Sequence, residues 1–497
     1  MPRLSSCISA LALTLASPAL AQVSAEDIWS EWQAASDATG QEMTADVTQT
    51  EDGLVLSNLT TRMEQDGTTS IGRVERVTLT ELDDGTLSVE IADPYTLEVT
   101  FPTETGGGEA TIEFLLSFEE LDIVVSGTAD ARSYAYSADV LRIVNGAISG
   151  PQPGRAPEMD LEIVMRDLAT TYDLFGTPGD AQRFESDGTV GSLAARLDLA
   201  PPPVEDGRLK LAFSIGGMSS TSSGTIVALA TLPQSAKGLP EDFEVAGSVS
   251  YDWTRFDVSF DSPADSFAAA YSNEGGEFGI ELSNEALAYD ISATGIEARV
   301  SGSEIPVAVA VSAASSELSL SLPLAASPEL SEASVRLDYR DLEAGDEAWA
   351  MIDPTGSVPR DPLTVILDAR AQVLIMRDMM DPAFAEAPTP PGEVRSLTVS
   401  ELELRFGDTS LTGLADLSFA AGQAVPQPVG DAFLRLEGGN ALLDRLQAAG
   451  VIGPEQAGMA RGMVGMFARP GATPDTLETT IEFGEGGSIT ANGIPLR

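Results

Sequence analysis

Hydrophobic and polar residues alternate along most of this chain, most regularly between residues 245 and 340. Alternation with a period of two is typical of strands that bury one face of a sheet. The runs return every 9 to 13 residues, with short polar or glycine-containing segments between them, which predicts an antiparallel meander. Their apolar positions are Phe278/Ile280/Leu282, Leu287/Tyr289/Ile291, Ile296/Ala298/Val300, Ile305/Val307/Val309/Val311 and Leu318/Leu320/Leu322/Leu324.

The same alternation recurs elsewhere in the chain. A turn at Asp84-Gly85 predicts a hairpin between the strands on either side of it. Open sheets rarely exceed about 10 strands, and bare edges aggregate, so a sheet this long must curl, close or be covered. We therefore predict a mainly β fold, a long curved antiparallel meander that encloses an apolar interior. The further runs are Val77/Leu79/Leu82, Leu87/Val89/Ile91, Leu209/Leu211/Phe213/Ile215, Val335/Leu337/Tyr339, Val365/Leu367 and Leu402/Leu404/Phe406.

A short helix is predicted near the N-terminus. Ser24 has the side chain of an N-cap, and Ile28 and Trp32 fall on one helical face. The helix is expected to end near Gly40. Its acidic residues disfavour an anionic membrane surface, so its apolar face is expected to dock on the sheet.

A helical hairpin is predicted over residues 440–469. Asn440 is expected to cap its first helix, Gly450 to end that helix, and Pro454 to begin the second. One side of the second helix carries Met459, Met463, Met466 and Phe467. Two interpretations stay open: the hairpin closes one end of the β core, or it forms an adaptable apolar lid over a lipid or peptide groove.

The first residues predict an exported, periplasmic protein. Arg3 precedes an apolar run that ends in Ala19-Leu20-Ala21, which is the pattern of a cleaved signal peptide over residues 1–21. This run is too short to span a bilayer, so no transmembrane segment is expected after cleavage. The rest divides into β-rich halves, 22–240 and 241–497, with a boundary near Lys237-Gly238-Leu239-Pro240.

Composition excludes several kinds of chemistry. The chain has no histidine, and its one cysteine, Cys7, lies in the predicted signal peptide. The mature protein would therefore lack disulfides, thiolate nucleophiles, Ser-His-Asp triads and zinc or copper sites built on imidazole or sulfur. The formal net charge of −50 repels phosphate backbones, so nucleic acid is not an expected partner.

No motif of an enzyme or a cofactor site is present. The sequence contains no phosphate-binding loop, dinucleotide fingerprint, nucleophile elbow or EF-hand loop, although an oxygen-ligand calcium site stays open. Asp83-Asp84 and Glu119-Glu120 are adjacent acids, but neighbouring strand residues point to opposite faces, so neither pair converges on one bond. We therefore predict a non-enzymatic protein without a cofactor.

The chain resembles a family of uncharacterised exported Gram-negative proteins, catalogued as domain of unknown function 2125. The N-terminal Ile28-Trp29-Ser30-Glu31-Trp32 also resembles the start of its mature chains. The ending from Gly487 to Gly493 is distantly similar to the closing strand of AsmA-like periplasmic proteins, which implies a long curved sheet with a groove for acyl chains. The main resemblance is carried by Leu442-Leu443-Asp444-Arg445-Leu446, Ala449-Gly450, Gly453-Pro454-Glu455-Gln456-Ala457, Met463, Met466-Phe467-Ala468-Arg469-Pro470, Asp475-Thr476-Leu477, Ile481-Glu482-Phe483 and Ala491-Asn492-Gly493.

Three roles follow from these features. The first is a periplasmic protein with an apolar groove that handles a lipid or assists envelope assembly, with Ile280, Leu287, Ile291 and Val307 expected in the groove lining. The second is a structural module with a solid core that presents a surface to envelope proteins. The third, a carboxylate-based hydrolase, requires two acids that converge in one cleft.

Overall fold

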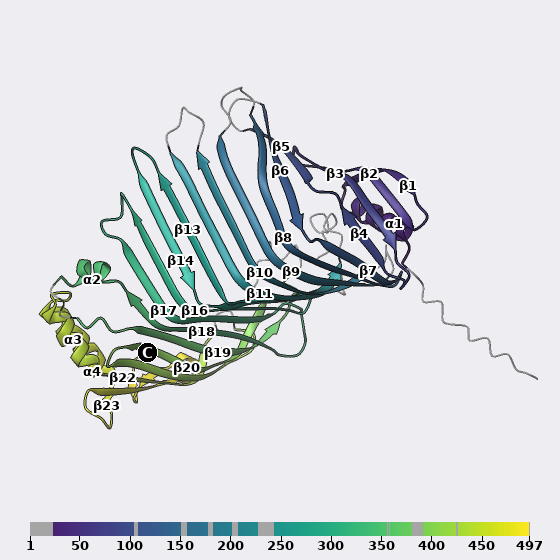
Figure 1. The fold of residues 1–497 in the computed structure, drawn as a ribbon. Coiled ribbons are helices and arrows are strands. Elements are labelled where there is room, and N and C mark those ends of the chain that lie inside the picture. Colours follow the sequence, from purple (N-terminus) through teal and green to yellow (C-terminus); the bar gives the residue numbers. More distant parts are fainter. Residues whose placement is uncertain are drawn as a thin grey trace, which may run out of the picture.

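The computed structural model describes residues 23–103, 108–150, 157–176, 182–200, 207–226, 243–354, 356, 358–379, 391–423 and 426–496. The strands within these residues belong to one sheet of 26 strands, and every pairing in it is antiparallel. Figure 1 shows a long curved layer with helices near its two ends. The predicted mainly β fold, with a curved antiparallel meander, is confirmed. The predicted signal peptide and the boundary at Lys237-Gly238-Leu239-Pro240 lie outside the described residues.

A helix covers the N-terminal end of the sheet. Helix α1 (Ala25–Ala38) begins after Ser24, whose hydroxyl accepts a hydrogen bond from the Asp27 N–H (3.1 Å), as the sequence predicted. Ile28 is fully buried against the sheet, which stabilises the fold by roughly 1.5–3 kcal/mol. The first strands are β1 (Glu42–Gln49), β2 (Gly53–Gln65), β3 (Thr68–Glu81), β4 (Leu87–Ile91), β5 (Tyr95–Pro102), β6 (Glu109–Glu119) and β7 (Asp122–Thr128).

Long strands form the middle of the sheet. Two pairs of shorter strands complete it, because β12 and β13 each pair with one half of β11, and β14 and β15 each pair with one half of β16. These elements are β8 (Ala131–Ser149), β9 (Glu158–Phe175), β10 (Gln182–Ala200), β11 (Arg208–Ile226), β12 (Glu244–Tyr251), β13 (Trp253–Asp261), β14 (Ser266–Asn273), β15 (Gly276–Ser283), β16 (Ala286–Gly302), β17 (Val309–Pro323) and β18 (Ser331–Ala344).

A bend crosses all of these strands at matching positions. Several residues in it have a left-handed backbone, among them Asp167 (φ 52°), Gly217 (φ 64°) and Gly295 (φ 58°). At each of these positions two successive residues face the same side, as in a β-bulge, and the strand turns. We call this row the bend; it comprises Asp139, Asp167, Gly191, Gly217, Asp252, Glu274, Gly275, Gly295, Ala314 and Asp341.

The bend divides the middle of the sheet into two walls. Wall 1 contains β13, β14 and the halves of the long strands that pair with them, and wall 2 contains β12, β15 and the remaining halves. On one side of the bend Ala293 and Ala313 are buried, whereas Asp167 and Asp252 are exposed on the other. The crowded side is the inside of the bend. We call it the inner face and the opposite side the outer face.

The bend corrects one prediction from the sequence. Leu287–Ile291 and Ile296–Val300 were expected to be separate strands, but both belong to β16. Thr294 and Gly295 both face outward, so the apolar residues before and after them stay on the inner face. Val307 was expected within a strand, but it lies in the turn before β17.

The C-terminal strands continue wall 2 and carry the predicted hairpin. This hairpin consists of α3 (Gly439–Ala448) and α4 (Pro454–Phe467), and Gly450 ends the first helix with φ 74°. Asn440 lies inside α3 and is not its cap. The remaining elements are α2 (Asp346–Ile352), β19 (Leu363–Ile375), β20 (Gly392–Phe406), β21 (Thr409–Phe419), β22 (Pro428–Glu437), β23 (Arg469–Pro470), β24 (Thr476–Phe483), the 3₁₀ turn η2 (Glu485–Gly487), β25 (Ile489–Ala491) and β26 (Ile494–Pro495).

The cap of α3 comes from a distant residue. The Asp475 carboxylate accepts hydrogen bonds from the backbone N–H groups of Asn440 (3.1 Å) and Ala441 (3.0 Å). The Asn440 side chain also donates to this carboxylate (2.7 Å). A carboxylate 34 residues away in the chain therefore does what the sequence assigned to Asn440. No helix in the described part of the chain is long and apolar enough to cross a membrane.

Candidate functional site

The inner face is the candidate site, because it is apolar on both walls. On β16 its residues are Leu287, Tyr289, Ile291 and Ala293 in wall 2, followed by Ile296, Ala298 and Val300 in wall 1. The register extends this surface across the sheet, since Leu287 pairs with Leu322 and Ile291 with Leu318. On the next strand Leu318 and Leu320 pair with Leu337 and Val335.

Three of the four residues predicted for a groove lie together on this face. Ile280 pairs with Tyr289, and Leu287 and Ile291 lie on either side of Tyr289 on the same strand. Val307 lies in a turn outside this surface. The predicted alternation, with apolar residues on one face and small or acidic residues on the other, is confirmed for these strands.

Helix α1 covers the N-terminal part of the inner face, and Trp349 of α2 stacks on Phe406 of β20. The buried hydrophobic cluster runs from Val23 to Tyr134 and includes the apolar face of α1. Leu56 and Leu87, which lie in this cluster, are 0% exposed, whereas Ile291 is 40% exposed. A large apolar side chain with this exposure has no layer packed over it. On β15–β18 the inner face is therefore an accessible apolar surface.

On the described strands, the register places two charged side chains on the inner face, Glu81 and Arg132. Both of them bind α1. The Glu81 carboxylate accepts a hydrogen bond from the Ala25 N–H (2.8 Å), at the positive end of the helix. Arg132, which is 6% exposed, pairs with Glu31 of α1 (3.3 Å). The charges of this face thus hold the helix in place and leave the rest uncharged.

Tyrosine side chains lie next to this contact. The Tyr134 hydroxyl donates to Glu31 (2.7 Å), and its ring stacks on Tyr136 with ring centres 6.1 Å apart. Burial raises the pKa of both hydroxyls, to about 12 for Tyr136, and the hydrogen bond to Glu31 raises that of Tyr134 further. Tyrosine hydroxyls are neutral at physiological pH, so these two side chains add no charge to the covered end of the inner face.

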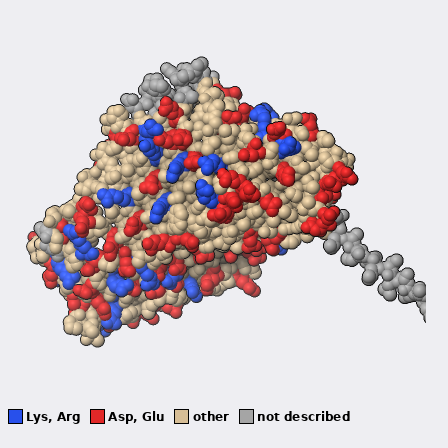
Figure 2. Space-filling model, in the orientation of Figure 1, with Lys and Arg blue, Asp and Glu red and all other residues tan. Residues whose placement is uncertain are grey.

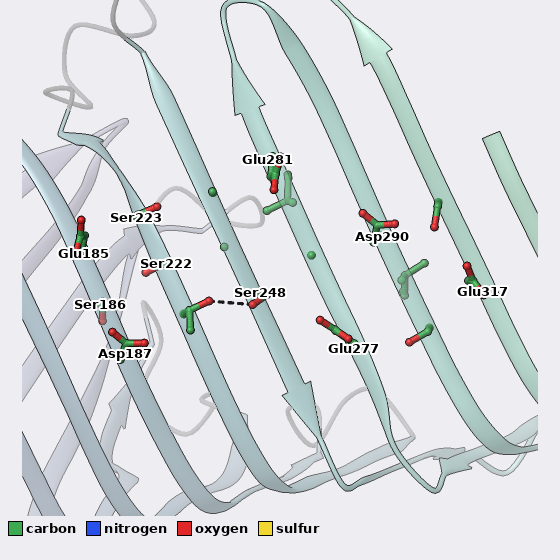
Figure 3. A pocket seen from close by; sticks show the side chains of 18 residues that line it. Glu185, Ser186, Asp187, Ser222, Ser223, Ser248, Glu277, Glu281, Asp290 and Glu317 are labelled. Atoms are coloured by element: carbon green, nitrogen blue, oxygen red, sulfur yellow. Dashed lines mark hydrogen bonds between the residues drawn. The ribbon is translucent and has the colours of Figure 1, made fainter. Parts of the chain in front are cut away.

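The outer face is polar and carries a second candidate. Figure 2 shows acidic side chains spread over the visible surface with basic ones among them. A depression of about 750 Å³ lies mainly on the outer side of wall 2, lined by six carboxylates, by small residues, and by Ile280 and Ile291. Figure 3 shows that these carboxylates come from several neighbouring strands. They are Glu185, Asp187, Glu277, Glu281, Asp290 and Glu317.

This depression does not hold the acid pairs that the sequence singled out. Asp84 lies in the turn between β3 and β4, where the Thr86 hydroxyl donates to its carboxylate (2.7 Å). Glu119 is the last residue of β6, and Glu120 follows it. Among the described residues, no group of three or more acidic side chains is arranged to hold a metal ion. Its six carboxylates make the depression a negatively charged surface.

The methionines of α4 face solvent. Met459, Met463 and Met466 are 66%, 57% and 59% exposed, respectively. Phe467 is half-buried, and its carbonyl accepts a hydrogen bond from the Asn492 side chain (2.8 Å). The structure thus places the methionines on an exposed surface at the end of the sheet. Whether they form a lid stays a prediction.

Comparison with known proteins gives one match. A family model described as an uncharacterised protein conserved in bacteria matches residues 247–496, just over half of the chain. The N-terminal segment Ile28–Trp32 lies outside this match. No curated protein and no solved structure matches the chain.

Proposed function

The chain belongs to this uncharacterised bacterial family, DUF2125, whose description assigns no activity. From the geometry of the sheet we propose that it is a non-enzymatic periplasmic protein that holds the acyl chains of a lipid on its inner face. The observation that carries this proposal is the apolar surface on β15–β18, which continues across both walls along β16 and is open at Ile291.

The physical basis is the cost of apolar surface in water. Monomeric soluble proteins rarely expose a contiguous apolar surface of more than a few hundred Å² without a function for it. Each buried methylene group contributes about 0.8 kcal/mol, so a chain of a dozen or more methylenes laid along this face gains a large free energy. Such binding needs no charged side chain. This agrees with the described inner face, where the charged Glu81 and Arg132 both bind α1.

The bend also supports this proposal. The inner face is concave at Ala293 and Ala313, where small side chains leave the floor shallow and the larger apolar residues stand on both walls. A flexible chain lying along the bend would contact both walls at once. α1 covers the N-terminal end and Trp349 of α2 stacks on Phe406 of β20, so the path for such a chain runs over the strands between them.

The first test compares two neighbouring residues of β16 that point to opposite faces. Ile291→Lys places a charge on the inner face, whereas Ser292→Lys places the same charge on the outer face beside Glu277 and Glu317. We expect native mass spectrometry and lipid extraction of the purified protein to show bound acyl lipid in the wild type and in Ser292→Lys, and much less in Ile291→Lys. Absence of lipid from the wild type, or equal lipid in both variants, would refute the proposal.

A second candidate function rests on the exposed methionines. Met459, Met463 and Met466 form an apolar stripe on α4, which favours an interaction surface for another envelope protein. Replacing all three with glutamine would weaken such an association and leave lipid on the inner face unchanged. The two roles are therefore separable by one triple variant.

A further inference from the structure

A buried polar cluster lies at the bend on the inner face. Asn273, the last residue of β14, is 4% exposed. Its side-chain nitrogen Nδ2 lies 3.0 Å from the hydroxyl of Tyr251 and 3.0 Å from the hydroxyl of Tyr271. Tyr251 ends β12 in wall 2 and Tyr271 lies on β14 in wall 1, so this amide connects the two walls.

The register places all three side chains on the inner face. Tyr271 pairs with Phe256, and Asn273 pairs with the buried Thr254. Tyr251 pairs with Gly276, and a side chain at that glycine would collide with the tyrosine hydroxyl. Gly276 thus makes the space that the Tyr251 hydroxyl occupies.

Three hydrogen-bonding functions of the cluster have no partner among the described residues. Both hydroxyls accept from the amide nitrogen, so each retains an O–H donor, and no described residue accepts from either. The amide oxygen Oδ1 of Asn273 is buried and has no partner among the described residues. Buried polar groups are nearly always paired, because an unpaired one is costly.

The number of free donors in the cluster is the same in both orientations of the amide. If its nitrogen and oxygen exchange places, the oxygen accepts from both hydroxyls and two N–H donors become unpaired instead. In either arrangement two donors await an acceptor. An additional oxygen atom would accept from these donors. On the described strands the two charged side chains of the inner face, Glu81 and Arg132, are engaged with α1 and do not attract an anion to the cluster.

We propose that the cluster of Asn273, Tyr251 and Tyr271 binds an uncharged oxygen of the lipid, an ester carbonyl or a hydroxyl, and so fixes the position of the lipid along the inner face. This inference rests on the proposed function and specifies its ligand as an oxygenated acyl lipid rather than any hydrocarbon chain. A hydroxyl or carbonyl oxygen has two lone pairs, which match the two donors of the cluster.

The experiment measures discrimination between matched lipids by competition in native mass spectrometry. One pair is diacyl and dialkyl phosphatidylethanolamine of equal chain length, which differ only in the ester carbonyls. The other pair is octadecanoic acid and hydroxyoctadecanoic acid. We expect the wild type to prefer the oxygenated member of at least one pair by about fivefold, as one or two hydrogen bonds would give. The pair that is discriminated identifies the source of the oxygen.

Variants assign this preference to the cluster. Tyr251→Phe/Tyr271→Phe removes both hydroxyls with little change of shape and is expected to bind the two members of each pair equally. Tyr289→Phe is the matched control, because it removes a hydroxyl from the same face at a ring that packs edge-on against Phe278, and it is expected to keep the preference.

The outcomes separate the two proposals. This inference is wrong if the wild type binds lipid but prefers neither member of either pair. It is also wrong if Tyr251→Phe/Tyr271→Phe keeps the preference of the wild type. Both results leave the proposed function intact. Absence of any lipid from the wild type overturns both. A preference lost only when the two hydroxyls are lost supports both.

Discussion

Asp167 of β9 lies directly over Gly191 of β10, at a distance where a Cβ atom on that glycine would fall 2.6 Å from the Asp167 carboxylate oxygen. The arrangement recurs along the bend, where Asp252 lies over Gly217 and Glu274 over Gly295. An acidic side chain on one strand thus occupies the space left by a glycine on the neighbouring strand. The bend is built from these acid–glycine pairs.

The first prediction tests these pairs. Gly191→Ala places a Cβ atom against Asp167, so we expect the free energy of unfolding to fall by about 1–3 kcal/mol. Asp167→Gly removes the obstructing side chain and suits the left-handed backbone at that position (φ 52°), so the double variant should recover most of the loss. Urea denaturation of the four proteins measures this coupling. If the changes in unfolding free energy of the two single variants simply add up in the double variant, Asp167 and Gly191 are not energetically coupled and the prediction is wrong.

The second prediction concerns the anchor of α1. Arg132→Met leaves the partly buried Glu31 carboxylate without its cation, and we expect a loss of about 3 kcal/mol in stability together with faster hydrogen exchange in α1. Arg142→Met on the same strand removes an exposed pair with Glu162 (2.7 Å) and should cost at most about 1 kcal/mol. Similar losses in both variants would contradict the role of Arg132 as an anchor.

The third prediction is a loss of stability at alkaline pH. Burial raises the pKa of Tyr136 to about 12, and burial with the hydrogen bond to Glu31 raises that of Tyr134 as well. In the unfolded chain a tyrosine has a pKa of about 10, and in the folded chain these two tyrosines have a higher pKa. Their protonated hydroxyls therefore stabilise the fold fully below about pH 10. This stabilisation is lost as pH rises toward the pKa of the folded chain.

The urea midpoint should therefore fall as pH rises from about 10 to 12, and less steeply in Tyr136→Phe. Tyrosinate absorbance checks the cause. Two of the eight tyrosines should ionise only when the chain unfolds. Ionisation of all eight near pH 10 in the folded protein would rule this explanation out.

The fourth prediction concerns the distant cap of α3. Burial alone would raise the pKa of Asp475, but hydrogen bonds from the Ala441 N–H and from Asn440 hold it below its ordinary value. Asp475→Ala should cost about 1 kcal/mol and increase hydrogen exchange in α3. Because the folded pKa is lowered, the wild-type contribution is present above about pH 4 and is lost as pH falls below it. Glu455→Ala, in the first turn of α4, is the control and should leave exchange in α3 unchanged.

The sequence by itself determined the class of the fold and the chemistry of its two faces. Alternation with a period of two is a local property, so runs such as Phe278/Ile280/Leu282 were sufficient to predict an antiparallel sheet with one apolar face. Cap and stop residues such as Ser24 and Pro454 were likewise sufficient to place helix ends. The absence of histidine and the presence of a single cysteine, Cys7, limited the available chemistry through composition alone.

Only the tertiary structure decided where these faces meet. Thr294-Gly295 in the sequence looks like a turn between two strands, and it proved to be the bend of one strand, because its neighbours on both sides keep their pairing. The cap of α3 by Asp475 and the cluster of Asn273 with Tyr251 join residues far apart in the chain. A local pattern specifies which way a side chain points along its own strand, but the partners it meets depend on the register of strands that pair across the whole sheet.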